Sequence, residues 1–231
     1  MTLSTQRLIA AIDTADAARA ADLIRKVGPY CGRVKLGLEF FLKHGPAGVA
    51  AFGDIPLFLD LKLLDIPNTV SKAVNSLAAL NMAMLTVHAA GGARMIEAAV
   101  AAAHAKGPTR PAILAVTVLT SLDASALYSI GVSGGTTQQV LRLGKLALDA
   151  GADGLVCSAH ELAPLRDAFG ETPILVVPGI RPAGSDVGDQ ARVMTPEAAV
   201  KAGASYIVVG RPITEAANPA AAAAAIAEAI L

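Results

Sequence analysis

Four charged side chains of alternating sign gather in the first third of the sequence. Asp60, Lys62 and Asp65 lie within and just beyond a leucine-rich run, and Lys35 lies within an earlier apolar run. Side chains two positions apart on a strand share a face, so Asp60 and Lys62 are expected to point the same way. Isolated charges in such a setting are costly, but these four can stabilise one another. The cluster is either a catalytic array or a salt-bridge network that only closes the fold.

Two arginines follow glycines at the ends of later apolar runs. Arg181 comes two positions after Gly179, and Arg211 comes directly after Gly210. Glycine lets backbone N–H groups approach an anion, and the arginine guanidinium adds a fork of donors. The pair indicates a phosphorylated ligand, although either arginine alone could be an ordinary surface residue.

Three other segments offer polar groups. Thr120 and Ser121 present hydroxyls suited to a polar heterocycle or a sugar, or to a helix cap. His88 could be a general base, but without a paired acid it fits better as a hydrogen-bonded support for the lysine. Residues 182–193 form a glycine-punctuated connection whose length is typical of a lid.

Short runs rich in β-branched residues and leucine must position these groups. They alternate with longer alanine-rich stretches of helical periodicity, which is the pattern of an α/β fold. The predicted strands span residues 8–13, 33–37, 57–62, 84–88, 112–118, 154–157, 174–178 and 206–210. The predicted helices span residues 15–27, 38–51, 67–80, 93–104, 137–150, 161–168, 196–201 and 219–230.

The repeated strand-helix unit predicts a (β/α)8 TIM barrel, a single domain over residues 1–231, because no long linker-like segment interrupts it. An open doubly wound sheet uses the same units. However, no Gly-x-Gly-x-x-Gly follows the first run, as a dinucleotide-binding sheet would require. Barrel sites lie at the C-terminal ends of the strands, and phosphate is commonly bound after the last two, where Arg181 and Arg211 fall.

Composition argues against several other classes of protein. The 19 Lys and Arg balance 19 Asp and Glu, and aromatic residues are only 3% with no Trp, so nucleic acid is a poor partner. Cys31 and Cys157 fit no metal or disulfide pattern and suit a reducing cytoplasm. No signal peptide and no bilayer-length apolar stretch is recognised, so we expect a cytoplasmic protein without a membrane partner.

The assembled motifs resemble the orotidine 5'-phosphate decarboxylase family over essentially the whole chain. The most specific segment is residues 58–70, Phe-Leu-Asp-Leu-Lys-Leu-Leu-Asp-Ile-Pro-Asn-Thr-Val, which is similar to the family's Asp-x-Lys-x-x-Asp-Ile-Pro-Asn-Thr signature. The supporting motifs, in the family's order, are Ala11-Ile12-Asp13, Val34-Lys35-Leu36-Gly37, residues 86–92, Leu119-Thr120-Ser121, residues 178–182, Asp189-Gln190 and residues 209–213. One departure is Leu63-Leu64, where bacterial relatives often have an aromatic-His pair of non-catalytic side chains.

The resemblance implies decarboxylation of orotidine 5'-monophosphate to UMP and carbon dioxide, with no cofactor and no metal. Lys62 would donate the proton to the ring carbon, flanked by Asp60 and by Asp65 of a second subunit in a homodimer. Lys35 would hold this array and contact the ribose with Asp13. The other substrate-binding positions that the resemblance implies are Ile66, Pro67, Asn68 and Thr69 of the signature, Thr120 and Ser121 at the pyrimidine, and Arg181, Gln190, Gly210 and Arg211 at the phosphate.

Two alternatives remain open on the sequence. A sister decarboxylase of keto-sugar phosphates resembles this family in its Asp-x-Lys-x-x-Asp element, but uses carboxylates to hold magnesium and stabilise an enediolate. The longer match through residues 66–69 and the Gln190 segment favour the nucleotide enzyme. The other alternative is a catalytically silent barrel that binds a nucleotide phosphate, which retention of all four charged residues disfavours.

Overall fold

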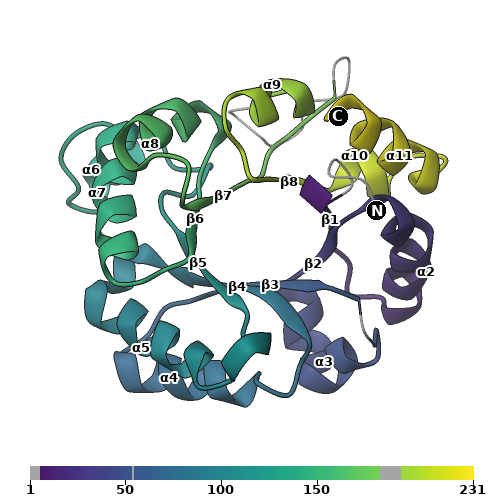
Figure 1. Ribbon diagram of the computed structural model, residues 1–231, viewed down its shortest axis with the longest axis horizontal. Coiled ribbons are helices and arrows are strands. Elements are labelled where there is room, and N and C mark those ends of the chain that lie inside the picture. The colour runs from purple at the N-terminus through teal and green to yellow at the C-terminus, as the bar shows by residue number, and fades with distance from the viewer. Residues whose placement is uncertain (1–5, 54, 183–193) are drawn as a thin grey trace.

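The computed structural model describes residues 6–53, 55–182 and 194–231, and in these the strands close into a parallel barrel (Figure 1). The strands are β1 (Leu8–Ile12), β2 (Arg33–Gly37), β3 (Leu57–Leu63), β4 (Met82–His88), β5 (Ala112–Val116), β6 (Gly154–Val156), β7 (Ile174–Val177) and β8 (Tyr206–Val209). They lie in sequence order around the ring, and β1 pairs with both β2 and β8. The predicted (β/α)8 TIM barrel is therefore confirmed, and an open sheet is excluded.

Helices surround the barrel on its outer face (Figure 1). They are α2 (Ala17–Val27), α3 (Leu38–Ala50), α4 (Pro67–Ser76), α5 (Ala93–His104), α6 (Ala124–Ser129), α7 (Thr136–Asp149), α8 (Leu162–Phe169), α9 (Pro196–Lys201), α10 (Arg211–Thr214) and α11 (Pro219–Ala229). Each predicted helix has its counterpart here. No helix in the described part of the chain has the length and apolar character needed to cross a membrane.

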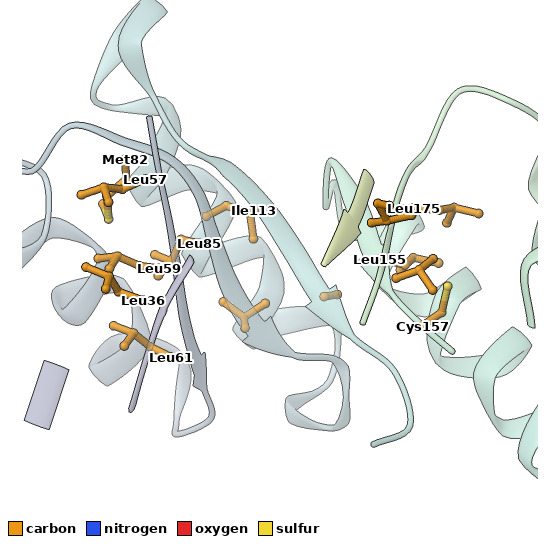
Figure 2. Close-up of a cluster of buried hydrophobic side chains, with 14 of the residues drawn as sticks. Leu36, Leu57, Leu59, Leu61, Met82, Leu85, Ile113, Leu155, Cys157 and Leu175 are labelled. Carbon is orange, nitrogen blue, oxygen red and sulfur yellow. The ribbon is translucent and has the colours of Figure 1, made fainter. Parts of the chain in front are cut away.

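Side-chain alternation along the strands divides the core into two layers. Figure 2 shows Leu57, Leu59 and Leu61 among the buried side chains of the larger cluster, which lies between strands and helices. Phe58 belongs instead to the small cluster inside the barrel. Because strand residues alternate between faces, Asp60 follows Phe58 toward the interior. The same alternation explains how the apolar strand β3 delivers a carboxylate to the barrel mouth.

The end of β3 departs from regular strand pairing. Leu59 pairs with Leu85 and Leu63 pairs with Val87, so three residues of β3 lie opposite the single Thr86 of β4. Within this bulge Lys62 has φ 50°, and among the described residues no other non-glycine has a positive φ. Bulges re-aim side chains and are frequent beside active sites. This bulge sets the direction of Lys62.

Candidate active site

Two adjoining cavities open at the C-terminal end of the barrel. The smaller, about 170 Å³, has Lys35, Asp60 and Lys62 on one side, and its other walls are mainly apolar: Phe58, Val116, Val118, Leu119, Thr120, Val156, Cys157, Val176, Pro178 and Val208. The larger, about 380 Å³, is lined by polar groups that include Asp13, Arg181 and Arg211. Lys35 and Asp60 line both cavities, so one elongated ligand with an apolar-faced ring and an anionic end could occupy both.

The charged side chains form an alternating row between the two cavities. Lys62 Nζ lies 2.8 Å from Asp60 Oδ1, and Lys35 Nζ lies 3.5 Å from Asp60 Oδ2. At the other end, Lys35 Nζ donates to Asp13 Oδ1 at 3.1 Å. The Lys35 side chain is 11% exposed and that of Lys62 is 31% exposed. Lys62 is therefore the lysine that a bound ligand reaches more readily.

The row keeps Asp60 ionised. Burial by itself would raise the pKa of this carboxyl, but the charges of Lys35 and Lys62, together with hydrogen bonds from Lys62 and Thr86, outweigh burial and lower it. The site thus holds a fixed negative charge directly beside an ammonium group.

His88, at the end of β4, does not form the predicted hydrogen bond. Within the described residues its Nδ1 is buried without a partner, and no hydrogen bond joins the ring to Lys62. Burial and, to a smaller degree, the positive charge of Lys62 lower the pKa of His88. A neutral imidazole close to the charged row is the state that this environment favours.

Asp65 does not join the row within one chain. The expectation from the sequence spacing that Lys35, Asp60, Lys62 and Asp65 stabilise one another is therefore wrong for Asp65 within a single chain. It is exposed, its Oδ1 accepts a hydrogen bond from the Ile66 N–H at 2.6 Å, and it makes no ion pair with the described residues. After the bulge at Lys62 the chain leaves the barrel, which carries Asp65 outward. Asp13 instead forms the end of the row opposite Lys62.

The other signature positions also lie away from the two cavities. Pro67, Asn68 and Thr69 form the first turn of α4, and Ile66 immediately precedes it. None of these side chains lines either cavity. Within a single chain they are therefore not brought to the row, in contrast to Asp60 and Lys62.

The predicted phosphate-binding groups come together in the larger cavity. Arg181, which is buried, Gly210 and Arg211 line it, with Gly179 and Glu215. Thr120 lines the smaller cavity, whereas Ser121 is exposed and does not. Gln190 and residues 183–193 of the predicted lid lie outside the described residues.

Sequence reasoning missed the fully buried Thr86, whose hydroxyl contacts both Lys62 and Asp60. A threonine inside a β-branched run is typical of an ordinary strand residue, so nothing in its local sequence distinguished it. Its position opposite an Asp-x-Lys bulge is visible only in the pairing of β3 with β4. The same holds for the apolar wall formed by Val116 and Val156, which the sequence places only within predicted strands.

No cluster of three or more His, Cys, Asp or Glu suited to holding a metal ion occurs in the described parts of this single chain. The charged groups of the row from Asp13 to Lys62 are instead paired with one another. This arrangement suits electrostatic stabilisation and proton transfer by side chains.

Comparisons with known proteins agree with this architecture. Residues 6–226 match the family model described as the orotidine 5'-phosphate decarboxylase / HUMPS family. A protein from an Anaeromyxobacter species, named orotidine 5'-phosphate decarboxylase, is 56% identical over 225 residues, covering 96% of this chain and 97% of that protein. One from Gluconobacter oxydans, with the same name, is 55% identical, covering 96% of each.

A solved structure agrees as well. The crystal structure of orotidine 5'-phosphate decarboxylase from Lactobacillus acidophilus superposes with a TM-score of 0.86 at 37% identity, covering 96% of this chain and 98% of that one. Sequence and structure thus match over nearly the full length of these relatives. The chain belongs to the orotidine 5'-phosphate decarboxylase / HUMPS family.

Proposed function

We propose that this protein is an enzyme that decarboxylates orotidine 5'-monophosphate to UMP and carbon dioxide without a cofactor, the last step of de novo pyrimidine nucleotide synthesis. The observation that carries the proposal is the row Asp13, Lys35, Asp60 and Lys62 between an apolar-walled and an arginine-lined cavity. Relatives 55–56% identical to this chain bear the name of this activity.

The two cavities fit the two ends of the proposed substrate. The pyrimidine occupies the apolar-walled cavity, where Thr120 offers a hydroxyl and the neighbouring Ser121 is a further candidate. The phosphate lies in the larger cavity with Arg181, Gly210 and Arg211, and Gln190 is proposed as a further phosphate ligand. The ribose then falls at the junction, beside Lys35 and Asp13.

The chemical difficulty is the electron pair left on the ring carbon when the carbon–carbon bond breaks. No carbonyl lies next to that carbon in a position to delocalise the charge. The ammonium of Lys62 gains interaction energy as negative charge develops, and it then transfers a proton to the same carbon, giving UMP and neutral Lys62. Lys62 takes up a proton from solvent before the next turnover.

Asp60 has two proposed roles. Its ionised carboxylate holds the Lys62 ammonium at 2.8 Å, and it places negative charge near the departing carboxylate of the substrate. Repulsion between Asp60 and the substrate carboxylate in the ground state also lowers the barrier to decarboxylation. In this scheme, stabilisation of the transition state by Lys62 contributes more. Lys35, which contacts both Asp60 and Asp13, fixes the row.

We further propose a homodimer in which Asp65 serves the site of the second subunit, with Ile66, Pro67, Asn68 and Thr69 beside it. Asp65 stands outside its own site, and its neighbours Leu64 and Ile66 are 56% and 66% exposed. Leucine and isoleucine side chains on both sides of an exposed carboxylate favour burial against another protein surface. A two-fold interface would repeat this contact in both directions.

Both cysteines are buried free thiols, which suits a cytoplasmic location.

The test is to add orotidine 5'-monophosphate to purified protein, with and without a chelator, and to follow loss of the orotate absorbance. Decay that is unaffected by the chelator is the expected result. Absence of decay would refute the proposal. Decay that the chelator abolishes would favour the magnesium-dependent sister chemistry.

A further inference from the structure

The hydroxyl of Thr86 joins the backbone and the side chains of the bulge in β3. Thr86 Oγ1 accepts a hydrogen bond from the Lys62 N–H at 2.8 Å and donates one to Asp60 Oδ1 at 3.0 Å. The same Asp60 oxygen lies 2.8 Å from Lys62 Nζ. Thr86, Asp60 and Lys62 thus form a closed ring of contacts, which we call the threonine bridge.

The backbone of Lys62 needs such a partner. Its φ of 50° lies in the left-handed region, which a residue with a Cβ atom occupies only when its surroundings hold it there. In the bulge, where Lys62 has no paired residue on β4, its N–H donates to Thr86 Oγ1. The hydroxyl therefore compensates directly for the irregular backbone.

The bridge also fixes the orientation of Asp60. Its Oδ1 accepts a hydrogen bond from the Thr86 hydroxyl and forms an ion pair with Lys62 Nζ. Its Oδ2 lies 3.5 Å from Lys35 Nζ. Lysine ammonium groups on flexible stems could follow a rotating carboxylate, whereas the hydroxyl of a fully buried threonine cannot. Thr86 thereby determines which carboxylate oxygen faces which lysine.

We propose that Thr86 is a positioning residue for decarboxylation: its hydroxyl holds Lys62 in the left-handed conformation and Asp60 in one rotamer. The ammonium and carboxylate then keep fixed places relative to the reacting carbon. This inference rests on the proposed function, because the reaction assigned to Lys62 depends on its placement. Thr86 does not itself touch the substrate in this scheme.

A second buried threonine provides a matched control. Thr117, just beyond β5, is also buried, and its Oγ1 donates to the Val156 carbonyl at 2.9 Å. It makes no ion pair or hydrogen bond with the charged row. Thr117→Val therefore removes one buried hydroxyl near the barrel mouth without altering the bridge.

The kinetic test compares Thr86→Val, Thr86→Ser and Thr117→Val. We expect Thr86→Val to lower kcat by about 10- to 100-fold, which corresponds to losing hydrogen bonds to a charged group and a buried N–H. KM and UMP affinity should stay within about threefold, because the proposed phosphate ligands Arg181, Gly210 and Arg211 are unchanged. Thr86→Ser retains the hydroxyl and should restore most of kcat, and Thr117→Val should remain near wild type.

Three kinetic results would overturn the inference. One is a Thr86→Val enzyme with kcat close to wild type. Another is a Thr86→Ser enzyme as slow as Thr86→Val, and the third is an equal loss of kcat in Thr117→Val. If Thr86→Val does not fold, Thr86→Ala, which places no extra methyl group against Asp60, takes its part in the same comparison.

Crystal structures of the variants test the bridge without relying on activity. In Thr86→Val we expect Lys62 to leave the left-handed region or Asp60 to exchange its lysine contacts, while Thr86→Ser keeps both. Unchanged Lys62 and Asp60 geometry in Thr86→Val would refute the positioning role. If the wild-type protein does not decarboxylate orotidine 5'-monophosphate, the proposed function fails, whereas these structures still decide whether the hydroxyl holds the bulge.

Discussion

Lys62 combines a strained backbone, a paired ammonium group and access to the cavity. Replacing it with alanine removes the proposed proton donor, which in the same proposal is the cation that faces the developing charge. We expect Lys62→Ala to lower kcat by at least about 10³-fold. UMP should still bind, because Arg181 and Arg211 remain in the larger cavity. Turnover and UMP titration measure the two effects.

The control for this variant is Lys145→Ala. Lys145 is an exposed residue of α7 that pairs with Asp149 at 2.8 Å, and it lines neither cavity. Its loss should leave kcat unchanged, since exposed pairs of this kind contribute little. A Lys62→Ala enzyme that still turned over at the rate of the control would remove Lys62 from its proposed role.

The ionisation of Asp60 predicts a pH-dependent contribution to stability. Its pKa in the folded protein lies below the ordinary value of 3.8. The ionised carboxylate therefore stabilises the fold at pH values above 3.8, and this contribution is lost as the pH falls through the folded pKa. We expect Asp60→Asn to lower the free energy of unfolding by about 1–3 kcal/mol at pH 7.

Urea unfolding of wild type and Asp60→Asn at pH 7 and near pH 3 measures this contribution. The difference between the two proteins should shrink at the lower pH, because below 3.8 the unfolded carboxyl binds a proton more readily than the folded one, whose pKa is lowered. A difference that is the same at both pH values would show that ionisation of Asp60 is not what stabilises the fold.

At the residue scale, the sequence predicts which charged residues form the row better than it predicts how they are arranged. Lys35, Asp60 and Lys62 stand out because charges inside leucine-rich strands require partners. The exclusion of Asp65 from the same row depends on the bulge at Lys62, and a lysine carries none of the local features that mark a left-handed residue. The contact between Thr86 and Lys62 depends on the same irregular pairing, so no pattern within either strand reveals it.

Among the elements, β6 depends on a close approach to β7. A Cβ built on Gly154 would lie 2.1 Å from the carbonyl oxygen of Ile174, a backbone atom that cannot move without disturbing the strand pairing. We expect Gly154→Ala to lower the free energy of unfolding by about 3 kcal/mol or more. Thermal or urea unfolding measures this loss.

Gly28→Ala is the matched control at the element scale. Gly28 follows α2 with φ −51°, and a Cβ built there meets nothing within 4 Å. The substitution should change stability by no more than about 1 kcal/mol, in either direction. If both variants were equally stable, the spacing of β6 and β7 would not depend on glycine.

Element boundaries were less predictable than element types. The strand predicted over residues 112–118 ends at Val116, where its pairing with β6 ends. Val118 is still buried, so the apolar pattern in the sequence continues beyond the strand and made the prediction too long. The helices α6 and α10 were missed since they have only six and four residues, too few for helical periodicity to show. Local capping forms the start of α6, where Asp123 accepts a hydrogen bond from the Ala126 N–H.

At the scale of the whole molecule, the repeated units predict closure of the ring, and the pairing of β1 with β8 confirms it. We propose on this basis that residues 1–231 act as one domain. The repeat does not predict whether one barrel supplies every residue of its own active site. The row ends at Lys62, and Asp65 is exposed between exposed apolar neighbours. On these grounds we propose that a second chain completes the site.

Mixing two inactive variants tests this completion directly. In a homodimer of the proposed kind, Lys62→Ala chains still carry Asp65, and Asp65→Ala chains still carry Lys62. A mixed dimer then contains one site with both groups intact and one with neither. After the chains exchange at random, about a quarter of all sites should be intact, so the mixture should regain about a quarter of wild-type activity while each variant alone stays inactive. If Asp65 served its own chain, every site would lack one group, and mixing would restore nothing.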